Sequence, residues 1–296
     1  MWFFGVFGFL LKKFQFEHWW FLAMFGGLIV IPWGVTLIGC PNAFAAYRSV
    51  PLHTILLSNV FALCWGIANL LCGLCLVRIG FALTGALMTG LGVSLGVTMP
   101  MIFKGSGLFK DAPDIGSTAG RTVLIAVAIM LLAVVFAAFA GFGRDRALQK
   151  MEKKSGSFLG GMIMAICGGV LSCGISFAFV YSQGPIVKAM QAQGASIIPA
   201  NFAVWAVGLL GGALVNVTYP MYLMTKNKSW GVLGSSPREI LLSGIIAVNF
   251  SVGIAAMGWG MLLLGRLGAS VGFGIQQAMQ MTGNQSGGFI SGEWRG

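Results

Sequence analysis

Residues 62–100 restrict what this chain can fold into more than any other stretch of the sequence does. They form two long apolar runs that meet at Arg78, and neither run contains a carboxylate or a lysine. An α-helix rises about 1.5 Å per residue, so about 20 apolar residues cross the roughly 30 Å hydrocarbon core of a bilayer. A surface helix of a soluble protein would carry charged residues along one face. We therefore predict two consecutive membrane-spanning helices.

The pattern around Arg78 returns near the C-terminal end of the sequence. Arg266 and Gly268 stand in the places of Arg78 and Gly80, and leucines precede both arginines at the same distances. The second copy covers residues 250–288. Apolar segments match easily by chance, so this match predicts an internal repeat but does not establish one.

The composition places the whole chain among polytopic helical membrane proteins. Hydrophobic residues make up 57% of the 296 residues, and charged residues make up only 8%. The net charge is +11, but the basic residues lie in short segments between apolar runs, where they set membrane orientation. We therefore expect the lipid bilayer, and no nucleic acid, as a partner. The six cysteines, among them Cys72 and Cys75, lie mostly in apolar runs and are typical of packing rather than of disulfide, redox or metal chemistry.

Hydropathy divides the chain into one short span and eight full spans. Residues 1–11 are apolar but cover only about half a bilayer, and Lys12 and Lys13 follow them, which is opposite to the order in a signal peptide. We therefore expect a truncated first span. The full spans are expected at 19–39, 54–77, 80–103, 122–142, 158–183, 201–224, 240–263 and 268–290.

The most charged segment, residues 143–156, divides the chain into two expected transmembrane repeats. The first would cover residues 1–155, and the second would cover residues 156–296 and lack its last span. The segments that follow odd-numbered spans, here called odd loops, hold twelve of the 18 Lys and Arg residues. The positive-inside rule therefore places the odd loops in the cytoplasm. Because the first repeat crosses the membrane an odd number of times, the second enters upside down, as in many secondary transporters.

The run Trp65-Gly66-Ile67-Ala68-Asn69, followed by Gly73-Leu74 and Gly80, carries a resemblance to a known family. It resembles the signature of the L-rhamnose–proton symporter family, within the drug/metabolite transporter superfamily. The resemblance implies an all-α polytopic membrane protein with an inverted five-plus-five helix repeat, a ten-span carrier that is incomplete at both ends here. Further matching pieces are Glu17 before Trp20, Ile31-Pro32-Trp33, Ile175-Ser176-Phe177-Ala178 and Gly292-Glu293-Trp294.

Polar side chains gather in the last apolar segment, where a neutral sugar would find hydrogen-bonding partners. Gln276, Gln280 and Asn284 are spaced four residues apart and share one helix face, with Gln277 beside them. Amides both donate and accept hydrogen bonds, as sugar hydroxyls require. We predict that these residues bind the substrate. The alternative is hydrogen bonding between helices.

Asn69 and Trp65, one helical turn apart, are the expected substrate-binding residues from the first repeat. The alternative for Asn69 is a bond that holds two helices together. Weaker candidates are Asn216, Asn249, Trp205 and Trp259, although tryptophan in a membrane protein is more typical of an interfacial anchor.

Proton coupling would require a titratable group in the transport path. No acidic residue lies in the middle of an expected span, but Glu17 and Glu293 lie at span boundaries beside tryptophans. Both match family positions, so the resemblance makes them the candidate ion-coupling residues; a structural role is the alternative. No histidine pair has metal-ligand spacing, and no Ser–His–acid set can be assembled. We therefore expect no metal, no cofactor and no enzymatic activity.

These observations predict a secondary transporter that moves a small neutral sugar across the bacterial cell inner membrane by alternating access. The resemblance implies L-rhamnose as the sugar and protons as the coupled ion, and facilitated passage is the alternative mechanism. Two other functions stay open: an exporter of small metabolites or drugs from the same superfamily, and a noncatalytic membrane scaffold or channel.

The charge distribution generates a test of orientation. Cysteines introduced into residues 143–156 of a cysteine-free variant should not react with membrane-impermeant thiol reagents in intact cells, because this loop is expected in the cytoplasm. A cysteine in the loop after the second span should react and serves as the control. Labelling of residues 143–156 in intact cells would contradict the orientation.

Overall fold

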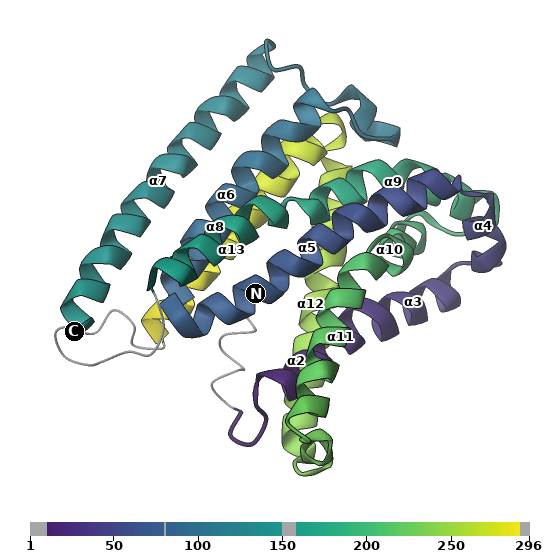
Figure 1. Ribbon diagram of the computed structural model, residues 1–296. Helices are drawn as coiled ribbons and strands as arrows, with labels where there is room; N and C mark the ends of the chain where they lie inside the picture. Colours follow the sequence, from purple (N-terminus) through teal and green to yellow (C-terminus); the bar gives the residue numbers. More distant parts are fainter. Residues whose placement is uncertain (1–10, 80, 150–157, 291–296) are drawn as a thin grey trace.

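Every regular element is helical in the part of the chain that the structure describes, residues 11–79, 81–149 and 158–290. The structure is a computed structural model (Figure 1), and it confirms the prediction of an all-α protein. In chain order the elements are α2 (Phe16–Phe25), η1 (Gly26–Val30), α3 (Ile31–Gly39), α4 (Ala43–Ser49), α5 (Leu52–Ile79), α6 (Phe81–Ile102), η2 (Gly107–Asp111), α7 (Thr118–Gln149), α8 (Phe158–Ser172), α9 (Gly174–Ala192), α10 (Ile197–Gly208), α11 (Leu210–Lys226), η3 (Trp230–Gly234), α12 (Pro237–Leu263), η4 (Gly265–Leu267), η5 (Gly268–Gly272) and α13 (Phe273–Ile290).

Six helical segments of the described residues are long and apolar enough to cross a membrane, and α10 and α11 together make a seventh. The protein is therefore a multi-pass membrane protein. The segment expected at 268–290 is helical, but it is not among these seven, since glycine and glutamine make it too polar. The short span expected at 1–11 falls almost wholly outside the described residues. The ten-span inverted repeat therefore stays a prediction.

Helices from the two expected repeats interleave. Within the described residues, α5 packs against α8, α9, α10 and α11, which all follow the proposed boundary at residue 155. Likewise α6 packs against α13, and α2 packs against α11 and α12. The long helix α7 stands at one edge of the bundle (Figure 1), with outward side chains such as Phe136 left 71% exposed, as expected for a face that meets lipid.

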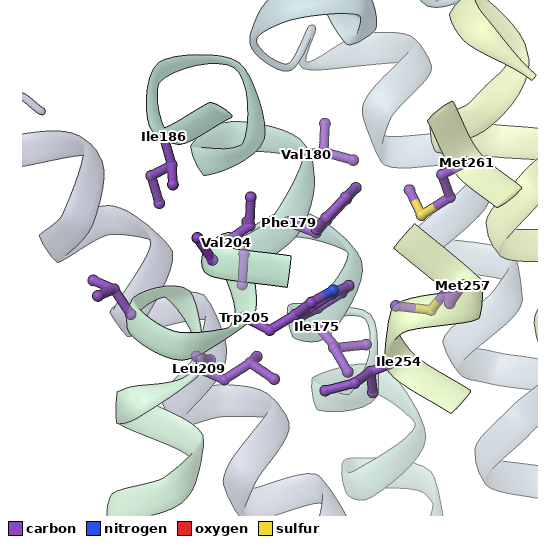
Figure 2. Close-up of a cluster of buried hydrophobic side chains, with 14 of the residues drawn as sticks. Ile175, Phe179, Val180, Ile186, Val204, Trp205, Leu209, Ile254, Met257 and Met261 are labelled. Atoms are coloured by element: carbon purple, nitrogen blue, oxygen red, sulfur yellow. The ribbon is translucent and has the colours of Figure 1, made fainter. Parts of the chain in front are cut away.

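A stacked aromatic pair lies at the centre of the main core. Trp205 of α10 lies parallel to Phe179 of α9, with ring centroids 4.6 Å apart (Figure 2). A Cβ atom at Gly258 of α12 would lie 3.1 Å from both rings, so this glycine lets α12 approach the pair. Trp205 is only 1% exposed. It is therefore a core residue and neither an interfacial anchor nor a stacking platform for a ligand.

A second cluster of buried residues contains Cys72 and Cys75 together with Ile79, Leu83 and Leu87. Both cysteines are less than 5% exposed, at 4% and 0%. Their position among apolar side chains supports the interpretation that they serve packing.

The span predicted at 201–224 is broken at Leu209, where α10 and α11 meet at an angle of 52°. A break leaves backbone groups without helical partners, and the bilayer core supplies no water to bind them. The side chain of Asn59 on α5 binds these groups: Nδ2 donates to the carbonyl of Val207 at 3.0 Å, and Oδ1 accepts the N–H of Gly211 at 2.7 Å. Ser58 of α5 adds a bond from its hydroxyl to the carbonyl of Gly208 at 3.3 Å, so side chains from the first half of the chain hold the bend.

Replacing Asn59 with leucine should destabilise the protein, because Asn59→Leu leaves the backbone groups of Val207 and Gly211 unpaired. We expect a loss of about 1–3 kcal/mol in the free energy of unfolding, measured in detergent micelles. Thr218→Val is the matched control, since the exposed Thr218 hydroxyl bonds, among the described residues, only to the carbonyl of Leu214 in its own helix. Equal stability of the two variants would show that Asn59 does not hold the bend.

Candidate functional site

A cavity of about 500 Å³ lies between α5, α12 and α13, with the facing ends of α8 and α9 closing one side. The α12 residues that line it lie between Ile246 and Gly260, and the α13 residues lie between Ile275 and Gln280. The cavity therefore extends from the middle of the bundle towards the end where α12 turns into α13. Its volume is in the usual range for small-molecule sites.

One wall of the cavity carries amide side chains from α13. Gln276, Gln277 and Gln280, all predicted to bind substrate, line it. Nε2 of Gln276 lies 3.4 Å from Oε1 of Gln280, as the four-residue spacing predicts, and Oε1 of Gln276 is buried without a hydrogen-bond partner. Gln277 is only 6% exposed, and its side chain makes no hydrogen bond within the described residues. Buried amides without partners are costly unless a ligand or water binds them.

The opposite wall is apolar and aromatic. Trp65 of α5 and Phe250 of α12 stack with centroids 6.0 Å apart and an interplanar angle of 25°. Ile246, Ile254 and Met257 of α12 continue this surface. Asn249 also lines the cavity, but its Nδ2 donates to the carbonyl of Ile245 in its own helix. The cavity thus presents amides on one side and apolar faces on the other.

A small extension of the site, a separate pocket of about 20 Å³, lies beside the cavity and is also lined by α6. Asn69, Thr89, Ser172, Gln277 and Gln280 contribute polar side chains to it. A space of this size holds about one water molecule.

Asn69 lines both the cavity and the extension, and it also bonds to a neighbouring helix. Its Nδ2 donates to Oδ1 of Asn216 on α11 at 2.9 Å. The same Oδ1 accepts the indole N–H of Trp20 at 3.1 Å. Both roles that the sequence left open for Asn69 are thus compatible with its position: it holds two helices together and it borders the cavity.

The bond between Asn69 and Asn216 is possible because α5 and α11 touch one turn earlier, at Gly66 and Gly212. A Cβ atom at Gly66 would lie 2.8 Å from the Cα atom of Gly212, which is closer than side chains pack. A Cβ atom at Gly212 would lie 2.7 Å from the ring of Trp65. These glycines let the helix backbones approach closely and make room for the indole.

No charged side chain lines the cavity within the described residues. Its hydrogen-bonding groups are amides and a hydroxyl, so the arrangement suits a neutral ligand with hydroxyl groups along one edge and an apolar face.

The other residues predicted for the site either lie away from the cavity or fall outside the residues that the structure describes. Glu17 does not line the cavity; it is 5% exposed and accepts a hydrogen bond from Nδ2 of Asn227 at 3.0 Å. Glu293 lies outside the described residues, and so does the side chain of Asn284, although its backbone belongs to α13.

The buried carboxylate of Glu239, at the start of α12, was not predicted from the sequence. Its oxygens accept the backbone N–H groups of Lys12, Lys13 and Phe14 at 2.6–3.1 Å. The only available signal was an acidic residue in the first turn of a helix, which is common at helix N-termini. This contact ties the N-terminal segment to α12 at the end of the bundle away from the cavity.

Adding one methyl group at Gly66 should push α5 and α11 apart. We expect Gly66→Ala to lower the free energy of unfolding by about 1–3 kcal/mol, because the backbone of Gly212 cannot move aside as a flexible side chain would. Gly244→Ala on α12 is the control, since a Cβ atom there would meet nothing within 4 Å. Thermal unfolding of both purified variants measures the difference, and equal melting temperatures would contradict the tight contact.

Comparison with known proteins gives the family. The model of the family described as L-rhamnose-proton symport protein (RhaT) matches residues 2–235. Similar proteins include the L-rhamnose-proton symporters of Yersinia pestis bv. Antiqua (strain Antiqua) and Yersinia pseudotuberculosis serotype O:1b (strain IP 31758), each 25% identical over 239 residues, which is 79% of this chain and 67% of the relative. No solved structure matches. The family match ends just before α12 begins at Pro237, yet it covers most of the chain, including α5 with Trp65 and Asn69. The chain belongs to the L-rhamnose-proton symport protein family.

Proposed function

We propose that this protein is a secondary transporter that moves a small neutral sugar across the bacterial inner membrane together with protons. The observation that carries the proposal is the cavity, where the glutamine side chains of α13 face an apolar, aromatic wall and no described lining residue is charged. A sugar offers hydroxyl groups to such amides and its ring face to such a wall. Family membership independently supports sugar transport by symport.

L-rhamnose is the first sugar to test. The relatives at 25% identity are named for it, and its methyl group and ring suit an apolar wall such as that of Phe250, Ile254 and Met257. However, α12 and α13 lie beyond the end of the family match at residue 235. A panel of neutral sugars is therefore needed, because these two helices provide most of the cavity wall.

Symport requires a group that takes up and releases a proton, and Glu17 is the described residue that we propose for it. Glu17 and Glu239 are both buried carboxylates. Three backbone N–H groups occupy the oxygens of Glu239, whereas Asn227 gives Glu17 one hydrogen bond. Glu17 therefore has fewer hydrogen-bond partners among the described residues than Glu239 has. Glu293 stays a second candidate for this role.

We further propose alternating access, with the cavity in its outward-open form. The cavity reaches the end of the bundle that carries the segment between α12 and α13, an even loop, which the charge distribution places outside. At the other end, Glu239 joins the N-terminal segment to α12 and closes that side. An inward-open form would need this contact to change.

Uptake of labelled sugars into proteoliposomes, with and without an imposed pH gradient, tests this function. Saturable L-rhamnose uptake that the gradient accelerates would support it. Linear, unsaturable flux would identify a channel, flux only out of preloaded vesicles would identify an exporter, and absence of flux for every sugar in the panel would contradict a sugar carrier.

Gln280→Ala should weaken sugar binding without unfolding the protein, because Gln280 lies in the middle of the amide wall. Losing one or two hydrogen bonds to a hydroxyl costs on the order of 0.5–1.5 kcal/mol each, or roughly a three- to tenfold weakening per bond. Asn69→Ala should behave alike. Gln191→Ala, at an exposed position near the end of α9, is the control.

Sugar affinity and thermal stability should be measured on the same purified variants. A lower melting temperature with unchanged affinity would show that the amides of α13 only join helices. The substrate residues would then have to lie elsewhere.

A further inference from the structure

We propose that Asn216, which does not line the cavity, is a positioning residue that fixes the amide of Asn69 so that its oxygen is presented to the sugar. The inference rests on the proposed sugar site. It concerns the chain of hydrogen bonds that runs from Trp20 of α2 through Asn216 of α11 to Asn69 of α5.

The orientation of Asn216 is determined by groups that can act in only one way. The indole N–H of Trp20 is a donor, so the Asn216 atom at 3.1 Å from it must be the oxygen. On the other side of the amide, two backbone carbonyls, of Gly66 at 3.2 Å and Gly212 at 2.9 Å, can only accept, so the facing atom must be Nδ2. Asn216 is 0% exposed, and no rotation of its amide satisfies these three partners in another way.

This fixed oxygen determines the orientation of Asn69 in turn. Oδ1 of Asn216 can only accept, so the Asn69 atom at 2.9 Å from it must be Nδ2. The same nitrogen also lies 3.5 Å from the sulfur of Met24, which is a weak acceptor. The polar atom that Asn69 has left for the cavity is therefore its carbonyl oxygen, an acceptor for a sugar hydroxyl.

Asn69 would lose this orientation without Asn216. The sulfur of Met24 alone discriminates poorly between the two ends of an amide, so nitrogen and oxygen could exchange places. A site with preorganised groups binds more tightly because the ligand need not order them. Asn216 should therefore raise the affinity for the sugar only by orienting Asn69. Its contribution to helix packing is a separate effect on stability.

The test is a double-mutant cycle on the purified protein, with binding of labelled L-rhamnose and thermal stability measured for each variant. We expect Asn216→Ala to weaken L-rhamnose binding roughly three- to tenfold, like Asn69→Ala. The double variant should bind no more weakly than Asn69→Ala does. Asn216→Asp, whose carboxyl is expected to be neutral at this buried position, keeps an acceptor oxygen for Trp20 and Asn69 and an O–H for one of the two carbonyls, and it should bind within about threefold of the unaltered protein.

Asn201→Leu provides the matched structural control. Asn201 is 5% exposed and its Oδ1 accepts a bond from Gln183 at 3.2 Å, but it does not line the cavity. This variant should lose stability while its affinity stays unchanged. If Asn216→Ala gives too little folded protein, the same cycle with Asn216→Leu, which fills the volume of the amide, decides the question.

The outcomes separate the inference from the function on which it rests. If the unaltered protein binds neither L-rhamnose nor another sugar of the panel, the proposed function fails. If it binds the sugar and removal of Asn216 leaves affinity unchanged, or weakens binding equally in the presence and absence of Asn69, the positioning role is wrong and Asn216 only joins helices.

Discussion

The contact between the backbones of Gly66 and Gly212 is the interaction on which the rest of the site depends. It brings α5 and α11 close enough for Asn69 to reach Asn216, and it leaves a space beside Gly212 that the ring of Trp65 fills. In a bilayer, where lipid tails solvate apolar side chains as well as a protein core does, such close packing and buried hydrogen bonds hold helices together. The same contact therefore stabilises the bundle and sets one wall of the cavity.

The amide side chains inside this protein fall into two groups, which differ in whether they have hydrogen-bond partners within the protein. The half-buried Asn59 binds three backbone groups, and the buried Asn216 binds two backbone carbonyls and two side chains. Oε1 of Gln276, by contrast, is buried without a hydrogen-bond partner within the described residues. A polar group that is buried and unpaired is expensive unless something else binds it. This contrast, rather than the mere presence of amides, is the reason why we propose a ligand at α13.

Local properties of the sequence predicted much of this arrangement. Apolar length predicted the helices, and the four-residue spacing of Gln276 and Gln280 predicted their shared face. Two segments that are far apart in the sequence, and that were both predicted to bind the substrate, meet at the cavity. They are the signature around Asn69 on α5 and the glutamines of α13. The break at Leu209 could not be predicted, because it depends on Asn59, which is remote in sequence. Nor could Trp205 be placed in the core, since a tryptophan suits an interface equally well.

Synthesis of the chain imposes an order on the hydrogen bonds of α5. Asn69 and its partner Asn216 are separated by 147 positions, and Asn59 and Val207 by 148. At about 5–20 residues per second, a ribosome needs roughly 7–30 s to add such a length. During this time α5 has already left the exit tunnel while the helices that satisfy its amides do not yet exist. Newly made α5 must therefore be kept from lipid by the insertion machinery, or pair transiently with other helices of the first half, until α10 and α11 arrive.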